Sequence, residues 1–243
     1  MPLPPTFDAR LVSARMISRS VRELTLERAD GAPLVFDAGQ WVNLVLPLES
    51  GEVRRAYSIA SAPAGTPRFE IAVTKVEHGP GSTFLHALLP GATLRTLGPQ
   101  GFFTRTKTRG APSLFIATGT GVTPLRSMLN AAMAEGEQAP LWLLCGVRRE
   151  DDMLYRDELE ALLAAHPHVH AEYTLSQPPP EWAHRRGYVQ AHVKELWDKM
   201  EALGKGKPHA YICGLQRMVG SVRDLLRKEM SVPREHVHSE RYD

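Results

Sequence analysis

The sequence predicts a two-domain fold, in which an antiparallel β-barrel precedes a doubly wound α/β domain with a parallel sheet. In the first 105 residues, short segments alternate in polarity or are β-branched, and glycine-containing turns separate them. From about Ser113, apolar strands alternate with amphipathic helices. The first pattern is typical of an antiparallel barrel, and the second indicates a parallel sheet covered on both faces. We therefore expect a barrel domain over residues 1–110 and an α/β domain over residues 111–243.

The expected barrel has six strands, which Asp-Gly, Ser-Gly, Ala-Gly and Pro-Gly turns separate. Such turns mark the ends of strands. A helix is expected over residues 82–89, after a glycine-containing turn, and the two domains join near residues 104–112. The strands are expected over residues 9–18, 21–29, 40–48, 54–61, 68–76 and 92–99.

The α/β half begins with an apolar strand over residues 113–119, and its first helix has clear boundary signals. Thr123 is a candidate N-cap, Pro124 suits the first helical position, and Gly136 ends the helix. Three further strand–helix pairs follow, without an internal repeat. Their strands cover residues 141–147, 170–176 and 209–215, and their helices cover residues 154–166, 189–200 and 217–230.

Composition excludes several classes of protein. Of the 243 residues, 43% are hydrophobic and 23% charged, as in ordinary globular proteins, and a net charge of +2 is too small to indicate nucleic-acid binding. No apolar run could span a membrane and no signal peptide is recognisable, so we expect a cytoplasmic protein. Two distant cysteines cannot form an iron–sulfur centre. The histidines of residues 166–170 lack the partners of a metal site, and no hydrolase nucleophile motif is present.

Positive charge is concentrated in the barrel half. Residues 1–110 hold 13 Lys and Arg against 9 Asp and Glu, a balance of +4, so the remainder of the chain carries −2. Between Arg95 and Arg109 there are four basic residues and no acidic one. This segment fits either a solvated loop or a docking patch for an acidic partner.

Three stretches carry chemistry or binding potential. RRAYSIAS, residues 54–61, has more hydrogen-bonding groups than a sheet edge requires, and fits either a solvated edge strand or a ligand-facing one. ATGTGVTP (117–124) and HGPGSTFL (78–85) are glycine-rich turns that each open a helix. Such helix starts offer backbone N–H groups to a phosphate, although tight turns and an N-cap at Ser82 explain the same residues without a ligand.

Two cysteines end parallel strands. Cys213 and Gly214 lie at the carboxyl end of a strand, the edge where ligands bind in open α/β sheets, and Cys145 occupies a similar place. A small buried side chain is an equally good interpretation of either cysteine.

With these residues in place, the sequence resembles the ferredoxin–NADP reductase family of flavoenzymes, from about residue 10 to the C-terminus. RAYS is similar to its R-x-Y-S motif, IAVTK to its next flavin-contacting strand, and GPGSTFL to its G-x-C-S-x-F-L turn, with Gly81 in place of the cysteine. The resemblance implies that Arg55 holds an FAD phosphate, Tyr57 stacks on the isoalloxazine and Ser58 hydrogen-bonds near flavin N5. The FAD-binding residues that it implies are Arg55, Ala56, Tyr57, Ser58, Ile71, Ala72, Val73, Thr74, Gly79, Pro80, Gly81, Ser82 and Thr83.

The second half is similar to the nicotinamide-binding part of the family. ATGTGVTP resembles the G-T-G-T-G-x-x-P loop, with Ala117 in place of the first glycine, and YICGL resembles the C-G motif. The tail SERYD resembles the terminal E-x-Y, with Asp243 as an extra residue. The resemblance implies that Tyr242 covers the flavin face until nicotinamide displaces it. The implied nicotinamide-site residues are Thr118, Gly119, Thr120, Gly121, Thr123, Pro124, Cys213, Gly214 and Tyr242.

The resemblance favours NADP(H) over NAD(H). Plant-type members of the family hold the 2′-phosphate with a Ser-Arg pair and a basic-x-Tyr segment. Ser176, Arg186 and Tyr188 match these positions, Arg185 stands alongside, and Gln177 replaces the arginine of the pair. Arginines pair well with phosphate, whereas the alternative is a solvated basic loop.

The resemblance therefore implies an FAD-dependent oxidoreductase. NAD(P)H delivers hydride to flavin N5, and single electrons then pass to a separate carrier, ferredoxin or flavodoxin, whose acidity suits the basic barrel. Ser58, Cys213 and Glu240 are the expected catalytic residues, and we expect a monomer. Alternatives are the reductase component of an oxygenase, a free flavin reductase, and a non-catalytic nucleotide-binding regulator.

Overall fold

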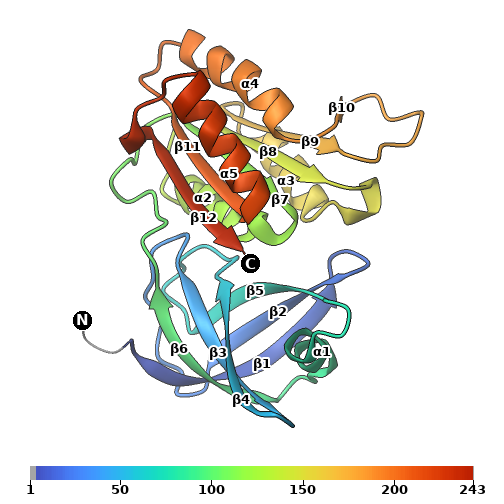
Figure 1. Cartoon of the computed structure of the whole chain (residues 1–243). Helices are drawn as coiled ribbons and strands as arrows, with labels where there is room; N and C mark the ends of the chain where they lie inside the picture. Colours follow the sequence, from blue (N-terminus) through green and yellow to red (C-terminus); the bar gives the residue numbers. More distant parts are fainter. Residues whose placement is uncertain (1–3, 243) are drawn as a thin grey trace. The chain divides into compact units, whose positions relative to one another are not determined.

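The computed structural model describes residues 4–242, so Asp243 lies outside the described residues. The chain divides into two compact units (Figure 1). Of the described residues, the first unit comprises residues 4–106 together with Arg126–Ala131, and the second comprises Lys107–Leu125 with residues 132–242.

The first unit is an antiparallel barrel-like sheet with the strand order β4-β3-β6-β1-β2-β5. Alternate residues of its strands point inward, and the buried set includes Leu24, Leu26, Leu44, Leu46 and Ile71. The chain that leaves β4 returns to β5, where Ala60 N–H donates to the Glu70 carbonyl at 2.7 Å. The strands are β1 (Thr6–Met16), β2 (Val21–Arg28), β3 (Trp41–Leu48), β4 (Gly51–Ser58), β5 (Arg68–Thr74) and β6 (Thr93–Gln100).

Helix α1 (Pro80–Ala87) starts two residues earlier than predicted. Its carboxyl end is held by the Arg22 guanidinium of β2, which donates to the carbonyls of Leu85 at 3.0 Å and Leu88 at 2.9 Å. These bonds satisfy acceptors that a helix end leaves without partners. The arrangement anchors α1 to the barrel.

The second unit is a parallel sheet with the strand order β10-β9-β8-β7-β11-β12. Its strands are β7 (Ser113–Thr118), β8 (Leu141–Val147), β9 (Val169–Leu175), β10 (Arg185–Arg186), β11 (His209–Leu215) and β12 (Val237–Tyr242). The predicted doubly wound parallel sheet is confirmed for β7, β8, β9 and β11. The short β10 and the edge strand β12 were not predicted, because both are polar and lack an apolar run.

Helices α4 (Gln190–Ala202) and α5 (Gln216–Asp224) cover one face of this sheet (Figure 1). Their apolar sides pack on Ile116, Leu144 and Ile212 of the central strands. Helix α3 (Arg156–Ala165) follows β8, and α5 continues as a π-helical segment over Leu225–Glu229. The predicted single helix over residues 217–230 is therefore two successive helical forms.

Helix α2 (Val122–Ala134) follows a 3₁₀ turn at Gly119–Gly121, and its middle turns belong to the first unit. There Arg126 donates to the Glu70 carboxylate at 2.7 Å and to the Ala60 carbonyl at 2.9 Å. The Arg126 side chain is 10% exposed, so this is a largely buried ion pair. It joins α2 to the segment that leaves β4.

Candidate functional site

Strand β4 carries the RAYS residues and pairs with β3, with Tyr57 opposite Val42 and Ser58 opposite Trp41. Ser58 is buried, whereas Arg55 and Ala56 are exposed. Tyr57 is half-buried against the barrel core, and burial raises its pKa to about 12, so its hydroxyl stays protonated at neutral pH. The strand thus presents a neutral aromatic ring and a cationic side chain within three residues.

The start of α1 differs from the predicted capping. Gly79 is the N-cap and Pro80 the first helical residue, so Ser82 is not an N-cap. The Ser82 hydroxyl accepts from Val76 N–H at 3.0 Å and donates to the Gly79 carbonyl at 3.0 Å. Ser82 therefore shapes the turn, and the first-turn N–H groups, which lack intrahelical acceptors, are left for a ligand.

Arg55 lies against this helix start. A Cβ built on Gly81 would lie 3.7 Å from Arg55 Cγ and 3.8 Å from its Nε. A guanidinium beside a helix N-terminus forms a site for an anion, because both groups are electropositive. Arg55 and the first turn of α1 therefore fit the pyrophosphate of FAD.

The segment IAVTK contributes mainly backbone to such a site. Ile71 and Val73 are completely or almost completely buried in the barrel core, and Ala72 is also buried. Thr74 and Thr83 are exposed. Of the residues predicted on β5, only Thr74 thus offers a polar side chain to a ligand.

The glycine-rich loop of the second unit connects β7 to α2. Thr123 is not an N-cap as predicted, because its hydroxyl donates to the Thr120 carbonyl at 2.8 Å, and Pro124 lies one turn into the helical region. Thr118 Oγ1 is buried, and within residues 4–242 it has no hydrogen-bond partner. A buried hydroxyl without a partner is costly, and it points to a ligand that the loop is built to hold.

Two glycines let this loop approach the end of β11. A Cβ on Gly121 would lie 2.2 Å from the Cys213 carbonyl oxygen, and one on Gly214 would lie 2.3 Å from Thr118 Oγ1. Gly214 also has a φ of +148°, which side chains rarely adopt. The motifs ATGTGVTP and YICGL thus form one cradle, which fits a nicotinamide nucleotide at the carboxyl edge of the sheet.

Cys213, Glu240 and Tyr242 meet beside this cradle. Cys213 pairs with Glu240 in the β11–β12 ladder. Burial raises the pKa of the Cys213 thiol, the Glu240 carboxylate raises it further, and the Tyr242 hydroxyl hydrogen-bonded to the sulfur partly offsets this. The thiol is therefore neutral. The Tyr242 and Thr123 hydroxyls lie 3.1 Å apart, so Tyr242 lies beside the start of α2.

The predicted phosphate-binding arginines already have protein partners. Arg185 is held by the Glu195 and Glu172 carboxylates, and these bonds raise the pKa of its guanidinium. Arg186 donates to the carbonyls of Pro180 at 2.8 Å and Trp182 at 2.6 Å. Arg185 thus stabilises the edge of the sheet and Arg186 its own loop, and phosphate binding by either arginine stays a prediction.

Arg148 is a functional candidate that sequence reasoning missed. It follows β8, and its carbonyl accepts from Gln177 N–H at 2.9 Å, which places it next to Ser176. Arg148 is exposed and forms no ion pair within the described residues. The signal in the sequence was Arg148 and Arg149 directly after an apolar strand, but only the β8–β9 register brings Arg148 beside Ser176.

The basic segment from Arg95 to Arg109 is not a free patch. Arg95 pairs with Glu52 at 2.6 Å, Arg109 pairs with Glu135 at 3.2 Å, and Arg105 is buried. Of the four basic residues, Lys107 is exposed without an ion pair in the described part of the chain. Within residues 4–242, Arg54 and Lys75 on the barrel are also exposed cations that form no ion pair, and they are the nearest such cations to the RAYS motif along the chain.

Among residues 4–242, no cluster of three or more His, Cys, Asp or Glu side chains is arranged to hold a metal ion. In the same part of the chain, no helix has the length and apolarity to cross a membrane.

Models of known protein families match both units of the chain. An oxidoreductase FAD-binding domain matches residues 8–104, and an oxidoreductase NAD-binding domain matches residues 115–224. Ferredoxin–NADP reductase B of Sorangium cellulosum is 61% identical over 238 residues, which is 98% of each chain. The phenol hydroxylase P5 protein of Acinetobacter pittii is 28% identical over 97% of this chain and 65% of its own.

Solved structures agree on the fold. The cytochrome P450 reductase GcoB of Amycolatopsis has a TM-score of 0.82 with 27% identity, over 99% of this chain and 71% of its own. A ferredoxin NADP⁺ reductase of Neisseria gonorrhoeae, with bound FAD and NADP, has a TM-score of 0.82 with 18% identity, over 97% and 98% of the two chains. The two-domain architecture is thus shared with reductases of this type.

Proposed function

Because this chain belongs to the ferredoxin–NADP reductase family, whose members bind FAD and a nicotinamide nucleotide, we propose that it passes electrons from NADPH to a separate acidic carrier protein. The single observation that carries the proposal is a close approach of glycine-containing backbone in each unit. Arg55 and the start of α1 support a site for FAD in the barrel, and the cradle of Thr118, Gly121 and Gly214 supports a site for the nicotinamide nucleotide. FAD, when bound, supplies acceptance of a hydride and release of single electrons.

The chain's own residues orient the reacting ring. Gly121 and Gly214 let the backbone approach it, and the Thr118 hydroxyl offers a hydrogen bond. The neutral Cys213 thiol and the Glu240 carboxylate are the proposed polar edge of the site in the second unit, and Ser58 is a proposed flavin contact of the first unit. Cys213 therefore holds and orients the ring, since its buried thiol carries no charge that could act as a base.

We propose that Arg148, with Ser176 and Tyr188, recognises the 2′-phosphate of NADP. Arg148 is exposed beside Ser176, and a guanidinium can pair with a phosphate through two hydrogen bonds. Arg185 instead stabilises the edge of the sheet through Glu195 and Glu172.

The test is anaerobic flavin reduction by NADPH and NADH, followed by stopped-flow absorbance. Arg148→Ala should weaken NADPH binding about tenfold to a hundredfold and leave NADH unchanged, because only NADPH carries the phosphate. Arg149→Ala, one residue further along, is the matched control. Equal losses for both nucleotides would show that Arg148 does not read the phosphate, and a colourless protein that binds no FAD would refute the function itself.

The acceptor is proposed to be ferredoxin or flavodoxin, because the Sorangium relative is named a ferredoxin–NADP reductase. Arg54 and Lys75 are the proposed contacts for an acidic partner, and carrier reduction should then fall with ionic strength. The second candidate is the reductase component of an oxygenase, since phenol hydroxylase and toluate dioxygenase components match 88–97% of this chain. This chain spans 60–65% of those relatives. A cytoplasmic monomer remains part of the proposal.

A further inference from the structure

Three histidine rings and one tyrosine ring form a row at the start of β11 and β12. The centroids of His236 and His209 are 4.3 Å apart, those of His209 and His238 are 5.3 Å apart, and those of His238 and Tyr211 are 4.6 Å apart. Successive rings are within 22° of parallel. We call His236, His209 and His238 the imidazole row. It ends on Tyr211, which is completely buried.

Hydrogen bonds limit the number of protons that the imidazole row can hold. His209 Nδ1 and His238 Nε2 lie 3.1 Å apart, so one nitrogen carries the hydrogen and the other presents its lone pair. His236 Nδ1 lies 2.9 Å from the Pro208 carbonyl and donates to it. Full protonation of the His209–His238 pair would point two N–H groups at each other, so the pair accommodates one proton between these two nitrogens.

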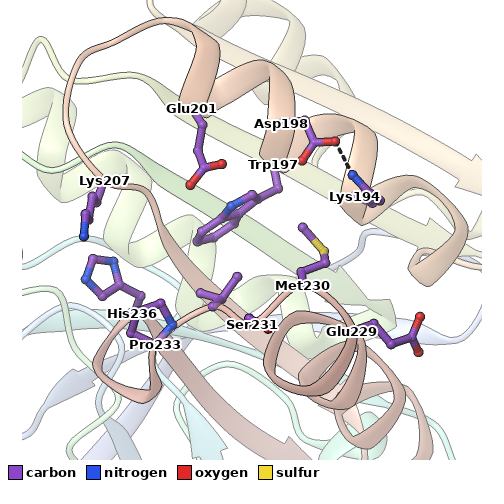
Figure 2. A pocket seen from close by; sticks show the side chains of 11 residues that line it. Lys194, Trp197, Asp198, Glu201, Lys207, Glu229, Met230, Ser231, Pro233 and His236 are labelled. Carbon is purple, nitrogen blue, oxygen red and sulfur yellow. Dashed lines mark hydrogen bonds and ion pairs between the residues drawn. The ribbon is translucent and has the colours of Figure 1, made fainter.

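The groups around the imidazole row carry charge of both signs, and Glu240 lies two residues after His238 on β12. His238 faces Tyr211, whose hydroxyl bonds Thr108, and both burial and His236 lower the pKa of His238. His236 opens on a pocket of about 330 Å³, where Lys207 lies beside it (Figure 2). The other charged groups of this region are Lys194, Asp198, Glu201 and Glu229 in the pocket and Arg234 and Glu235 on the same turn.

The imidazole row lies at the base of the strand that carries two site residues. β12 is the edge strand, and it pairs with β11 through Tyr211 and His238, then Cys213 and Glu240. His238, Glu240 and Tyr242 are alternate residues, so they share one face, and successive members are about 6.5 Å apart. A displacement of His238 therefore moves Glu240.

We propose that the His209–His238 pair is a positioning element for Glu240 and Tyr242, which anchors β12 to β11 while it shares one proton and loosens the strand when acidification adds a second. The effect of the His209–His238 pair on flavin reduction rests on the proposed function. The anchoring of β12 by this pair does not depend on that function.

The direction of the pH effect follows from proton linkage. The pKa of His238 is lowered in the closed strand, so the opened strand binds more protons below the ordinary histidine pKa of about 6.5. Anchoring is therefore complete well above that pH and is lost as the pH falls through the window below it. One extra proton taken up on opening increases the opened population roughly tenfold per pH unit.

The test is hydrogen–deuterium exchange of residues 237–242 in the FAD-loaded protein between pH 7.5 and 5.5, corrected for intrinsic exchange rates. Wild-type protection should fall by up to about fivefold between pH 6.5 and 5.5, because an opened-strand pKa of about 6.5 leaves half of that site already protonated at pH 6.5. His238→Gln keeps a hydrogen-bonding side chain without a titrating group, so its protection should stay nearly constant. His209→Gln is the second variant, in case the first does not fold. His170→Gln, which removes an exposed imidazole on β9, should respond as the wild type does.

Flavin reduction by NADPH supplies the second readout. Its rate should fall on acidification in the wild type and fall less in His238→Gln. A flat wild-type protection profile, or the same pH response in His238→Gln, would overturn the proposal. If the rate of flavin reduction depended on pH in the same way in the wild type and in His238→Gln, the pair would have no positioning role. If neither nucleotide reduces the flavin at any pH while the exchange results hold, the proposed function fails and the anchor stands.

Discussion

Gly121 is where the nicotinamide cradle is tightest, and Gly121→Ala tests the cradle directly. The added Cβ would lie 2.2 Å from the Cys213 carbonyl oxygen, 2.5 Å from its carbon and 2.7 Å from Gly214 N. All three are backbone atoms, and Cys213 pairs with Ala117 on one side and Glu240 on the other. Ordinary contact begins at 3.4 Å, so loop and strand must separate by about 1 Å.

Overpacking lowers the free energy of unfolding by about 1–3 kcal/mol. We expect a value near about 3 kcal/mol here, because the hydrogen-bonded backbone atoms cannot rotate away as a side chain could. Urea denaturation of the FAD-loaded protein measures this loss of stability. Anaerobic titration should also show NADPH affinity reduced by about tenfold or more, because Cys213 and Thr118 are displaced from each other. FAD should stay bound, since the flavin residues Arg55 and Tyr57 belong to the barrel unit.

Gly220→Ala is the matched control, because it is the same substitution in the same unit. A Cβ on Gly220 meets no atom within 4 Å, and Gly220 lies inside α5. Alanine there should raise stability by about 0.5–1 kcal/mol and leave NADPH affinity unchanged. If Gly121→Ala matches this control in stability and in NADPH affinity, the reasoning about the cradle is wrong.

Further substitutions test three separate features: the Thr118 hydroxyl, the Arg126–Glu70 ion pair, and the proposed roles of Ser58 and Glu240. Thr118→Val removes a buried hydroxyl that has no partner in the described residues, so the stability of the protein should hold or rise. NADPH binding should weaken severalfold in an anaerobic titration. Unchanged NADPH affinity would contradict the proposed ligand contact of Thr118. Arg126→Met leaves Glu70 unpaired and should cost about 3 kcal/mol in urea denaturation, and Glu70→Gln in that background should recover part of it. Ser58→Val and Glu240→Ala should each slow flavin reduction in stopped-flow measurements without loss of FAD, and wild-type rates in both would rule out their proposed roles.

The elements that the sequence predicted correctly are those with strong local periodicity. The apolar run at Leu141–Val147 has the predicted bounds, because a strand buried on both faces needs nearly every residue to be apolar. β12 escaped prediction because an edge strand is half-exposed, and its residues VHSERY contain a single aliphatic side chain. Its place beside β11 depends on pairing between residues far apart in the chain.

Roles within the motifs were harder to predict than the motifs themselves. Ser82 and Thr123 have the right chemistry for N-caps, but their hydroxyls bond inside the preceding turns. Arg186 suited a phosphate by type and spacing, yet three loop carbonyls accept from its guanidinium. A hydroxyl or guanidinium can bond several partners, so only the folded geometry decides which one it takes.

By itself, the sequence determined the two-domain order, the alternation of strand and helix, and the two glycine-rich helix starts. These properties follow from side-chain period and from backbone freedom, which neighbouring residues control. The tertiary structure decided that Arg148 lies beside Ser176, that Gly121 touches Cys213, and that the histidines of β11 and β12 form one row. Each of these depends on strand order and register, and long-range packing alone sets them.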